Sequence, residues 1–143
     1  IRNILRKEPH LVHALMILDI DDFKKFNDTY GHIEGDKVIQ AVSCRIKNTF
    51  RKSDIVGRFG GDEFIIFIPD IGEAQWLYNK FPELTRVEAE RYTCTNSVGV
   101  AVFPQDAKNF DELFKKADAA LYRAKTRKGR AMFFQDIEGA SPV

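Results

Sequence analysis

The chain has 143 residues, of which 44% are hydrophobic, so it is long enough for one domain with a full core and too short for two domains of ordinary size. Its formal net charge of +1 gives no overall attraction to nucleic acid or to an anionic membrane, and neither is expected as a partner. Two cysteines, Cys44 and Cys94, are too few for a disulfide framework and are expected to be buried thiols in a reducing compartment.

The first part of the chain predicts a helix, a strand and a second helix. The segment "IRNILRK" has the apolar spacing of a short helix, which ends near Pro9. Residues 13–20, "HALMILDI", form a nearly continuous apolar run of the length expected for a strand that is buried on both faces. Asp21 or Asp22 is then suited to cap a short helix, and Gly31 is suited to end it.

The middle of the chain predicts a long amphipathic helix followed by a hairpin. Residues 33–50 carry apolar side chains at helical spacing, namely Val38, Ile39, Val42, Ile46 and Phe50. The segments "DIVGRF" and "EFIIFI" predict two strands on either side of Gly60 and Gly61, because this pair provides the positive φ that a two-residue turn requires. Pro69 is expected to end the second strand.

The last part of the chain begins with residues 71–92, which are mostly helical in character although Pro82 interrupts them. The segment "TCTNSVGVAVF" predicts a strand that stops at Pro104. The segment "NFDELFKKADAALYRAK" has one apolar stripe and predicts an amphipathic helix. After the basic turn "TRKGR", the segment "AMFF" is expected to form a last edge strand.

These elements predict an α/β fold with helices around a central sheet. Strands alternate with helices, but one turn joins two strands directly, so at least one antiparallel pair is expected in a sheet otherwise rich in crossovers. No apolar run approaches the ~20 residues of a membrane span. The chain begins without an initiator methionine or a signal-peptide pattern, so residues 1–143 are expected to be one cytoplasmic domain of a longer protein, whose topology and any membrane anchor stay open.

Carboxylates stand at the ends of two strands that are predicted to be neighbours. Asp19 ends the first strand, and Asp62 and Glu63 follow the hairpin glycines, so all three are expected at one edge of the sheet. Hard oxygen ligands of this kind suit Mg²⁺, which also takes waters and substrate phosphates. Singly, these acids have plain alternatives, a helix cap or a solvated turn. Together with Lys24 and the glycines they favour metal-assisted phosphate chemistry.

Four segments in this order resemble the successive motifs of one family: "LDIDDFKKFNDTYGHIEGD", "RKSDIVGRFGGDEF", "NSVGVAVFP" and "ADAALYRAK". From about residue 13 to residue 134 the chain is similar to the GGDEF family, the diguanylate cyclases that condense two GTP molecules into cyclic di-GMP. The resemblance implies a palm-like α/β domain with a mixed central sheet, a glycine-turn hairpin and flanking helices, as in nucleotidyl cyclases and polymerases.

The resemblance also implies the catalytic and metal-binding residues. Asp19, the backbone carbonyl of Ile20, Asp62 and Glu63 match the family's ligands for Mg²⁺ or Mn²⁺. Asp62 matches the group that accepts the proton of the 3′-hydroxyl. Lys24 matches a lysine that stabilises charge on the transferring phosphate, although a solvated lysine is the commoner fate of this residue type.

Recognition of GTP is implied for a second group of residues. Asn27 and Asp36 match the pair that reads the guanine edge, and Phe23 matches a further substrate contact. An aspartate accepts hydrogen bonds from guanine N1–H and N2–H₂, a donor pair that adenine lacks. Asp36 is equally suited to the first turn of the long helix, where the helix dipole favours an acid. Gly60 and Gly61 would let the backbone approach phosphate oxygens that a Cβ would exclude.

A basic pair near the C-terminus is implied to bind the triphosphate. Lys125 and Arg130 lie close to its expected positions, but the usual "AKxxGRN" is here "AKTRKGRA", with one residue added and Ala131 in place of the asparagine. The sequence therefore leaves open which of Arg127, Lys128 and Arg130 binds phosphate.

Arg51 and Asp54, in "RKSD", match the family's inhibitory R-x-x-D site for cyclic di-GMP. The fork of an arginine suits guanine and phosphate alike. A tetrapeptide of this kind also arises as a simple surface ion pair, and the second arginine that often completes the site has no match in "EAQWLYNKFPEL".

The implied reaction needs two copies of the domain, because one site cannot arrange two GTP molecules symmetrically. The family's opening "DxLTGLxNR" is absent, and an isolated domain is expected to be mostly monomeric. Two other functions stay open. One is a silent GGDEF module that binds GTP or cyclic di-GMP and regulates a neighbouring domain, and the other is an adenylyl-type cyclase or polymerase palm, which Asp36 argues against.

Overall fold

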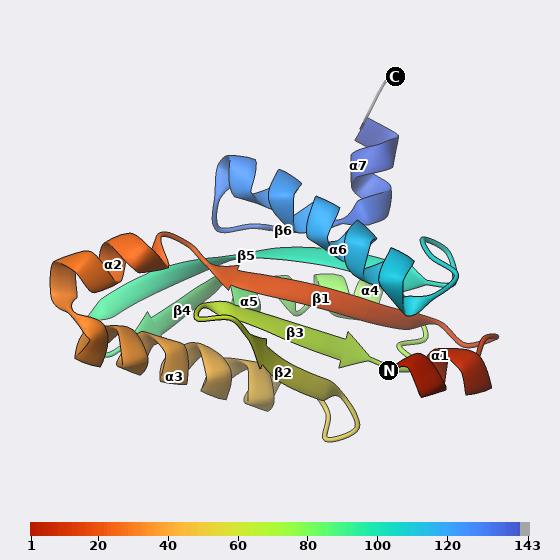
Figure 1. Ribbon diagram of the computed structural model, residues 1–143, viewed down its shortest axis with the longest axis horizontal. Coiled ribbons are helices and arrows are strands. Elements are labelled where there is room, and N and C mark those ends of the chain that lie inside the picture. The colour runs from red at the N-terminus through yellow and green to blue at the C-terminus, as the bar shows by residue number, and fades with distance from the viewer. Residues whose placement is uncertain (141–143) are drawn as a thin grey trace.

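The computed structural model describes residues 1–140 and shows a central sheet with helices on both faces (Figure 1). The helices, in chain order, are α1 (Arg2–Lys7), α2 (Phe23–Tyr30), α3 (His32–Thr49), α4 (Gln75–Tyr78), α5 (Phe81–Thr85), α6 (Phe110–Ala124), the 3-10 helix η1 (Lys125–Arg127) and α7 (Phe134–Ala140). The strands are β1 (His13–Ile20), β2 (Ile55–Phe59), β3 (Glu63–Ile68), β4 (Arg86–Ala89), β5 (Tyr92–Phe103) and β6 (Ala131–Phe133).

The sheet has the strand order β2-β3-β1-β5-β4, and every neighbouring pair along this path is antiparallel. β6 pairs with β5 in parallel, so the sheet is mixed, as predicted. The predicted crossovers are present, since β1 lies between β3 and β5 and neither of them follows it directly in the chain. Among the described strands, the antiparallel pairs outnumber the one parallel pair. The α/β class, the hairpin and the last short strand are confirmed.

The core lies on both faces of β1, whose eight residues are all buried, as predicted. Leu15 and Ile17 point to the face that α1 and α6 cover, and Met16 and Leu18 point to the face that α3 and α5 cover. This alternation follows from the two-residue period of a strand. Among the described residues, no helix is long and apolar enough to cross a membrane.

Helix α6 crosses the sheet at Gly99 of β5, where the two backbones meet directly. A Cβ at Gly99 would lie 2.2 Å from the backbone nitrogen of Leu121 and 2.3 Å from the carbonyl oxygen of Ala117. A larger residue would push the helix away from the sheet. The close crossing therefore fixes the C-terminal end of α6, which carries Lys125, next to the end of β1.

The prediction of a mostly helical segment over residues 71–92 is wrong. The structure has two short helices there, and then β4, which pairs with the start of β5 through a turn at Glu90, whose φ is +56°. Pro82 stands in the first turn of α5, where a missing N–H costs nothing, and it does not interrupt a longer helix. β4 has four residues, too few for a periodic pattern to reveal. Helix α7 was not predicted either.

Two details of the predicted turns also differ. The hairpin loop has three residues, Gly60 to Asp62, because Phe59 pairs with Glu63, and of the two glycines Gly60 alone has a positive φ, +76°. Asp22 stands at the N-cap position of α2 with a φ of +54°, but its side chain makes no capping hydrogen bond.

The expectation that both cysteines are buried is wrong for Cys44, which is exposed on α3. Cys94 is partly buried on β5, and burial raises the pKa of its thiol to about 11. Both thiols are free, as expected. Cys44 is exposed because it is not one of the residues by which α3 packs on the sheet, such as Val38, Val42 and Ile46.

Candidate functional site

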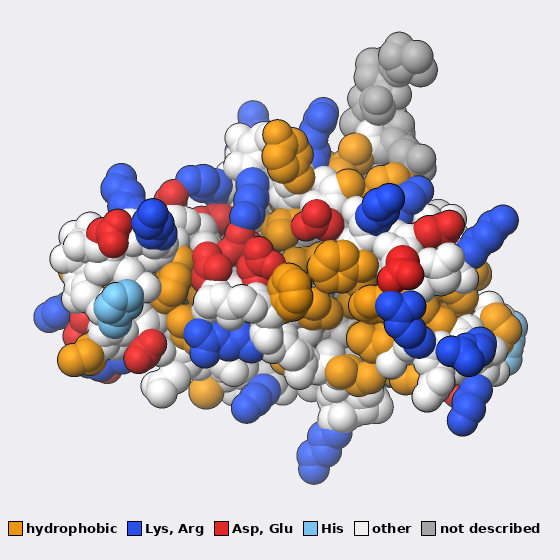
Figure 2. All heavy atoms as spheres, in the orientation of Figure 1, with side chains coloured by type: hydrophobic (Ala, Val, Ile, Leu, Met, Phe, Trp, Pro, Cys, Tyr) orange, Lys and Arg blue, Asp and Glu red, His pale blue; other side chains and the backbone are white. Residues whose placement is uncertain are grey.

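The three predicted carboxylates lie together at one edge of the sheet. The antiparallel register of β1 and β3 places Asp19 opposite Glu63, and the backbone N–H of Ile20 donates to the carbonyl oxygen of Asp62 at 3.1 Å. Figure 2 shows acidic side chains gathered on this face, beside a group of apolar side chains. The register thus brings the end of one strand and the tip of the hairpin together.

Asp19 is the most buried of these acids, with a side chain that is 8% exposed. Its Oδ2 forms an ion pair with Nζ of Lys125, and its Oδ1 is buried with no hydrogen-bond partner among the described residues. Burial raises the pKa of Asp19 to about 6, the hydrogen bond from Lys125 lowers it in part, and neighbouring Asp62 raises it again. A buried carboxylate oxygen without a donor is an open ligand position.

The pKa values of Glu63 and Lys125, which lie beside Asp19, are shifted as well. Burial raises the pKa of Glu63, Lys125 offsets part of this shift, and Asp62 and Asp118 add to it. Burial alone would lower the pKa of Lys125, but the ion pair with Asp19 and the other carboxylates raise it above its ordinary value. For Lys125 the nearby negative charge is therefore stronger than the cost of burial, so its ammonium group stays charged.

The carboxylates fit a magnesium ion. A cavity of about 250 Å³ lies against them, and Asp19, Ile20 and Asp62 all line it. Among the described residues, no group of three or more acidic, histidine or cysteine side chains forms a complete metal cage. Mg²⁺ does not need one, because it usually binds through one or two carboxylates, waters and substrate phosphates. The orphaned Oδ1 of Asp19 supplies the hard oxygen that such a site requires.

Lysines surround the same cavity. Lys24 comes from α2, Lys125 from η1 and Lys128 from the turn that follows. Nζ of Lys128 lies 2.5 Å from Oδ1 of Asp22. Arg130 is absent from this lining, since its guanidinium donates to the C-terminal end of α6.

The predicted guanine-reading residues lie on the adjoining helices. Asn27 is on α2 and has a buried Oδ1 with no hydrogen-bond partner among the described residues, while Asp36 is exposed on α3. Asp36 lies just beyond the first turn that was predicted for it, because α3 begins at His32 and Glu34 is the acid of its first turn. The two helices meet at Gly35, where a Cβ would lie 1.8 Å from Oδ1 of Asn27 and 3.3 Å from the ring of Phe23. Sequence reasoning missed Gly35. Its signal was a glycine within a helix, which costs about 1 kcal/mol and so needs a reason.

The tip of the hairpin is open. Nothing lies within 4 Å of a Cβ built on Gly60 or on Gly61, so a ligand can approach this backbone. Arg58 holds the tip, because its Nε and Nη2 both donate to the carbonyl oxygen of Gly61, at 3.3 and 2.9 Å. This role of Arg58 was also missed, since a charged residue on an edge strand is ordinarily solvated.

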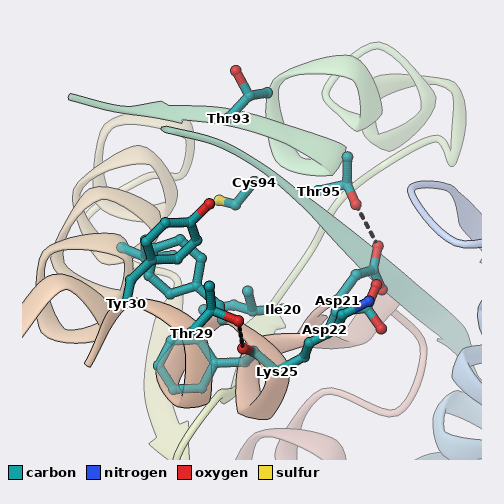
Figure 3. Close-up of a pocket in the computed structure, with 12 residues that line it drawn as sticks. Ile20, Asp21, Asp22, Lys25, Thr29, Tyr30, Thr93, Cys94 and Thr95 are labelled. Atoms are coloured by element: carbon teal, nitrogen blue, oxygen red, sulfur yellow. Dashed lines mark hydrogen bonds between the residues drawn. The ribbon is translucent and has the colours of Figure 1, made fainter. Parts of the chain in front are cut away.

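A larger cavity, of about 420 Å³, faces the side of α2 that carries Phe26 and Tyr30 (Figure 3). Figure 3 shows the Thr95 hydroxyl, from β5, pointing at Asp21, to which it donates at 2.7 Å. Ser97 donates to the same carboxylate at 2.6 Å. This cavity does not include the carboxylates of β1 and β3. Asp19 and Asp62 line the smaller cavity instead, and Asp21 ties the end of β1 to β5.

Arg51 and Asp54 lie at the opposite end of the β2–β3 hairpin from the glycines. The Asp54 side chain is fully buried and accepts from the backbone N–H of Arg51 at 2.7 Å and from its Nη2 at 3.1 Å. Nη2 of Arg51 also donates to the carbonyl oxygen of Pro69 at 2.7 Å. The ring of Trp76 lies 5.6 Å from the Arg51 guanidinium and 5.4 Å from Nζ of Lys80, which stands where a second arginine was sought.

A family described as "Diguanylate cyclase, GGDEF domain" matches residues 2–131. The probable diguanylate cyclase DgcC of Escherichia coli is 38% identical over 118 residues, which are 78% of this chain and 32% of DgcC. The cyclic di-GMP phosphodiesterase NbdA of Pseudomonas aeruginosa is 38% identical over 129 residues, which are 85% of this chain and 16% of NbdA. The chain thus spans less than half the length of these relatives.

Solved structures agree with the fold. The GGDEF domain of YfiN (TpbB) from Pseudomonas aeruginosa matches with a TM-score of 0.81 and 27% identity, over 92% of this chain and 89% of that one. The GGDEF domain of DgcB from Caulobacter crescentus, in complex with c-di-GMP, matches with a TM-score of 0.80 and 27% identity, over 93% of this chain and 82% of that one.

Proposed function

The chain belongs to the GGDEF family, and on that basis we propose that it is an active diguanylate cyclase domain. It joins two GTP molecules into cyclic di-GMP and releases two pyrophosphates. In each of two steps a 3′-hydroxyl oxygen attacks an α-phosphate, and the bond between the α- and β-phosphates breaks. The observation that carries this proposal is the pairing of β1 and β3, which places Glu63 opposite Asp19 and puts Asp19 and Asp62 against one cavity rimmed by lysines.

Asp19, the carbonyl of Ile20, Asp62 and Glu63 are proposed to hold Mg²⁺ or Mn²⁺. The ion, when bound, neutralises charge on the phosphates and makes the attacking hydroxyl more acidic. Asp62 accepts the proton of the 3′-hydroxyl. Lys24, from the first turn of α2, stabilises the charge that develops on the transferring phosphate.

Asn27 and Asp36 are proposed to select guanine. The buried, unpartnered Oδ1 of Asn27 supports this role, because a polar atom in that state usually has a ligand or water as partner. The exposed carboxylate of Asp36 accepts from guanine N1–H and N2–H₂. Phe23, which contacts the same helix junction, packs against the base. The open backbone of Gly60 and Gly61 receives the phosphates.

Two domains are proposed to face each other during the reaction. Each GTP supplies one hydroxyl and receives one attack, and this chain offers a single carboxylate site and a single guanine-reading pair. A twofold pairing brings the two sites together and makes the reaction effectively unimolecular. The relative DgcB is described with a coiled coil next to its GGDEF domain, a natural device for such pairing.

The test is to incubate the purified domain with GTP and Mg²⁺ and to identify the product by mass spectrometry. Cyclic di-GMP is expected, at an initial rate that rises faster than linearly with protein concentration. A coiled-coil dimeriser fused before Ile1 should raise the rate per domain. Strict proportionality in a demonstrated monomer would rule out the facing pair.

A silent GGDEF module is the second candidate. NbdA, which contains a segment similar to this chain, is named for cyclic di-GMP hydrolysis, so a segment of this kind also occurs in a protein named for the opposite activity. A silent module would bind GTP and yield no product. The complete set of carboxylates, with Lys24, Asn27 and Asp36, favours the active domain.

Arg51 is proposed to contact cyclic di-GMP when the product returns to the domain. The c-di-GMP complex of the DgcB GGDEF domain supports product binding in a relative. Because Asp54 is fully buried, its part is to hold Arg51, and the half-exposed guanidinium makes the contact. Trp76 and Lys80 supply a ring and a second cation beside it.

A further inference from the structure

Two basic residues near the C-terminus, Lys128 and Arg130, are separated by a single glycine and face different parts of the molecule. Lys128 lines the cavity of about 250 Å³ that contains Asp19 and Asp62. Arg130 lies against the end of α6. This difference determines which of the two cations can reach a phosphate group in that cavity, where Asp19 and Asp62 are proposed to hold the metal ion.

Arg130 uses three of its five N–H donors at the end of α6. Its Nε donates to the carbonyl oxygen of Ala124 at 3.2 Å, and its Nη2 donates to the carbonyl oxygen of Arg123 and to the hydroxyl of Thr126, both at 2.9 Å. The last carbonyls of a helix have no partner within the helix, and a cationic side chain that binds them stabilises the helix end. To present the Nε and Nη2 edge of its guanidinium to a phosphate, Arg130 would have to give up these carbonyls.

The backbone around Arg130 is fixed as well. Its carbonyl oxygen accepts from the N–H of Val98 at 3.0 Å, which aligns the start of β6 with β5. Arg130 thus joins three elements, α6, β5 and β6. This is the position of a structural residue at the junction of the helix and the last strand.

Lys128 has a different setting. Its side chain is 51% exposed, and its one ion pair, with Asp22, is at the rim of the cavity, where Lys24 and Lys125 also lie. Gly129, with a φ of +78°, turns the chain between the two cations, so that Lys128 faces the cavity and Arg130 faces the helix. Three ammonium groups therefore surround one site, one from α2 and two from η1 and the residue that follows it.

From this arrangement we infer that Lys128, and not Arg130, is the second cation that binds the triphosphate of GTP together with Lys125. The inference rests on the proposed function, because it takes GTP to be the ligand of this cavity. It also gives the extra residue in "TRKGR" a consequence: the added residue places a lysine at the cavity and leaves the arginine to the end of α6.

The experiment measures binding without turnover. The probe is the GTP analogue with a methylene group between the α- and β-phosphates, whose P–C bond cannot be cleaved, with Mg²⁺; guanosine is the probe that lacks phosphate. Calorimetry compares the parent domain with Lys128→Ala, Arg130→Gln and Arg127→Ala. Arg127 is the matched control, since it is exposed, carries the same charge and is absent from the lining of the cavity.

Lys128→Ala is expected to weaken binding of the triphosphate analogue about tenfold, the effect of losing one hydrogen bond to a charged group, and to leave guanosine binding unchanged. Arg127→Ala should change neither. Arg130→Gln should lower the melting temperature without a selective loss for the triphosphate. A parent domain that binds the analogue while Lys128→Ala behaves like Arg127→Ala would overturn the inference alone. A parent that binds neither the analogue nor GTP would overturn the proposed function with it.

Discussion

The carboxylate edge and the Arg51–Asp54 corner lie at opposite ends of one hairpin, and they differ in how well their polar groups are satisfied. At the edge, Oδ1 of Asp19 is buried without a hydrogen-bond partner among the described residues. At the corner, Arg51 donates to the carboxylate of Asp54 and to the carbonyl oxygen of Pro69. Buried polar groups normally find partners, so the unsatisfied Oδ1 of Asp19 supports the proposal that a ligand binds at the carboxylate edge. The hydrogen bonds of Asp54 already stabilise the corner without a ligand.

The largest effect on activity is expected from substitutions at the carboxylate edge. Asp62→Ala or Asp19→Ala should lower GTP turnover by about 10³-fold or more, because a lost metal ligand removes several kcal/mol of charge stabilisation. The fold should survive, as shown by circular dichroism and melting. Asp28→Ala, an exposed acid of α2 outside the cavity, is the control and should stay active. Near-normal product formation by folded Asp62→Ala would refute the assignment.

A substitution at the Arg51–Asp54 corner should have the opposite effect: it should lower the stability of the domain and leave GTP turnover unchanged. Asp54→Ala leaves the N–H of Arg51 without its acceptor, and the loss of hydrogen bonds to a charged group costs about 1.5 to 3 kcal/mol in the free energy of unfolding. Urea unfolding measures this change. Asp111→Ala breaks an exposed pair with Arg2 and should cost about 1 kcal/mol or less. Equal costs for the two variants would show that the corner is not structural.

The arrangement of the carboxylate edge could be predicted from sequence better than that of the Arg51–Asp54 corner. Asp19, Asp62 and Glu63 could be placed together, because strand ends and a hairpin tip are local features that a sheet brings to one edge. The contacts of the Arg51 guanidinium with Trp76 and Pro69 could not be predicted, because both partners are distant in sequence and reach Arg51 only through packing. The direction of Arg130 likewise depends on where α6 ends.

The fold shows the same limit. Long periodic segments such as α3 and α6 were found, and so was the buried run of β1. β4 was missed within a segment taken as helical, because four alternating residues carry little signal and their pairing with β5 is non-local. Gly35 and Gly99 looked ordinary in sequence, yet each marks a contact between two elements that admits no side chain.

A third prediction concerns the acidity of the open edge in the absence of metal. Burial raises the pKa of Asp19 from 3.8 to about 6, so the folded domain holds this proton more tightly than the unfolded chain does. The contribution to stability is therefore present below about pH 4 and is lost as the pH rises through 6, with a size of up to about 3 kcal/mol.

The measurement is the free energy of unfolding against pH in chelator-containing buffer, for the parent and for Asp19→Asn. The parent should lose stability relative to Asp19→Asn between pH 4 and pH 7. Parallel curves would show that Asp19 does not titrate as its burial requires. At the corner, Asp54→Asn serves as the comparison outside the cavity.

A smaller effect is expected for the base. Asp36→Ala should weaken GTP binding and erode the preference for GTP over ATP, because an unmatched guanine donor pair costs about 1 to 3 kcal/mol. Competition between the two nucleotides for the domain measures the preference. Equal binding of GTP and ATP by the parent domain would show that Asn27 and Asp36 do not select guanine. The carboxylate edge would then recognise only the phosphates of the nucleotide.

The smallest effect is expected for the binding of cyclic di-GMP at the Arg51–Asp54 corner. Cyclic di-GMP must compete with Asp54 and Pro69 for the guanidinium of Arg51, which is already engaged at 3.1 and 2.7 Å. Arg51→Ala should therefore weaken cyclic di-GMP binding only a few-fold, about 1 kcal/mol, and leave GTP binding unchanged. Calorimetry with each nucleotide separates the two sites. A hundredfold or greater loss of affinity for cyclic di-GMP would mean that Arg51 leaves its partners to bind the ligand. The corner would then act as a switch, because the product would stabilise one arrangement of Arg51 and Asp54 over the other.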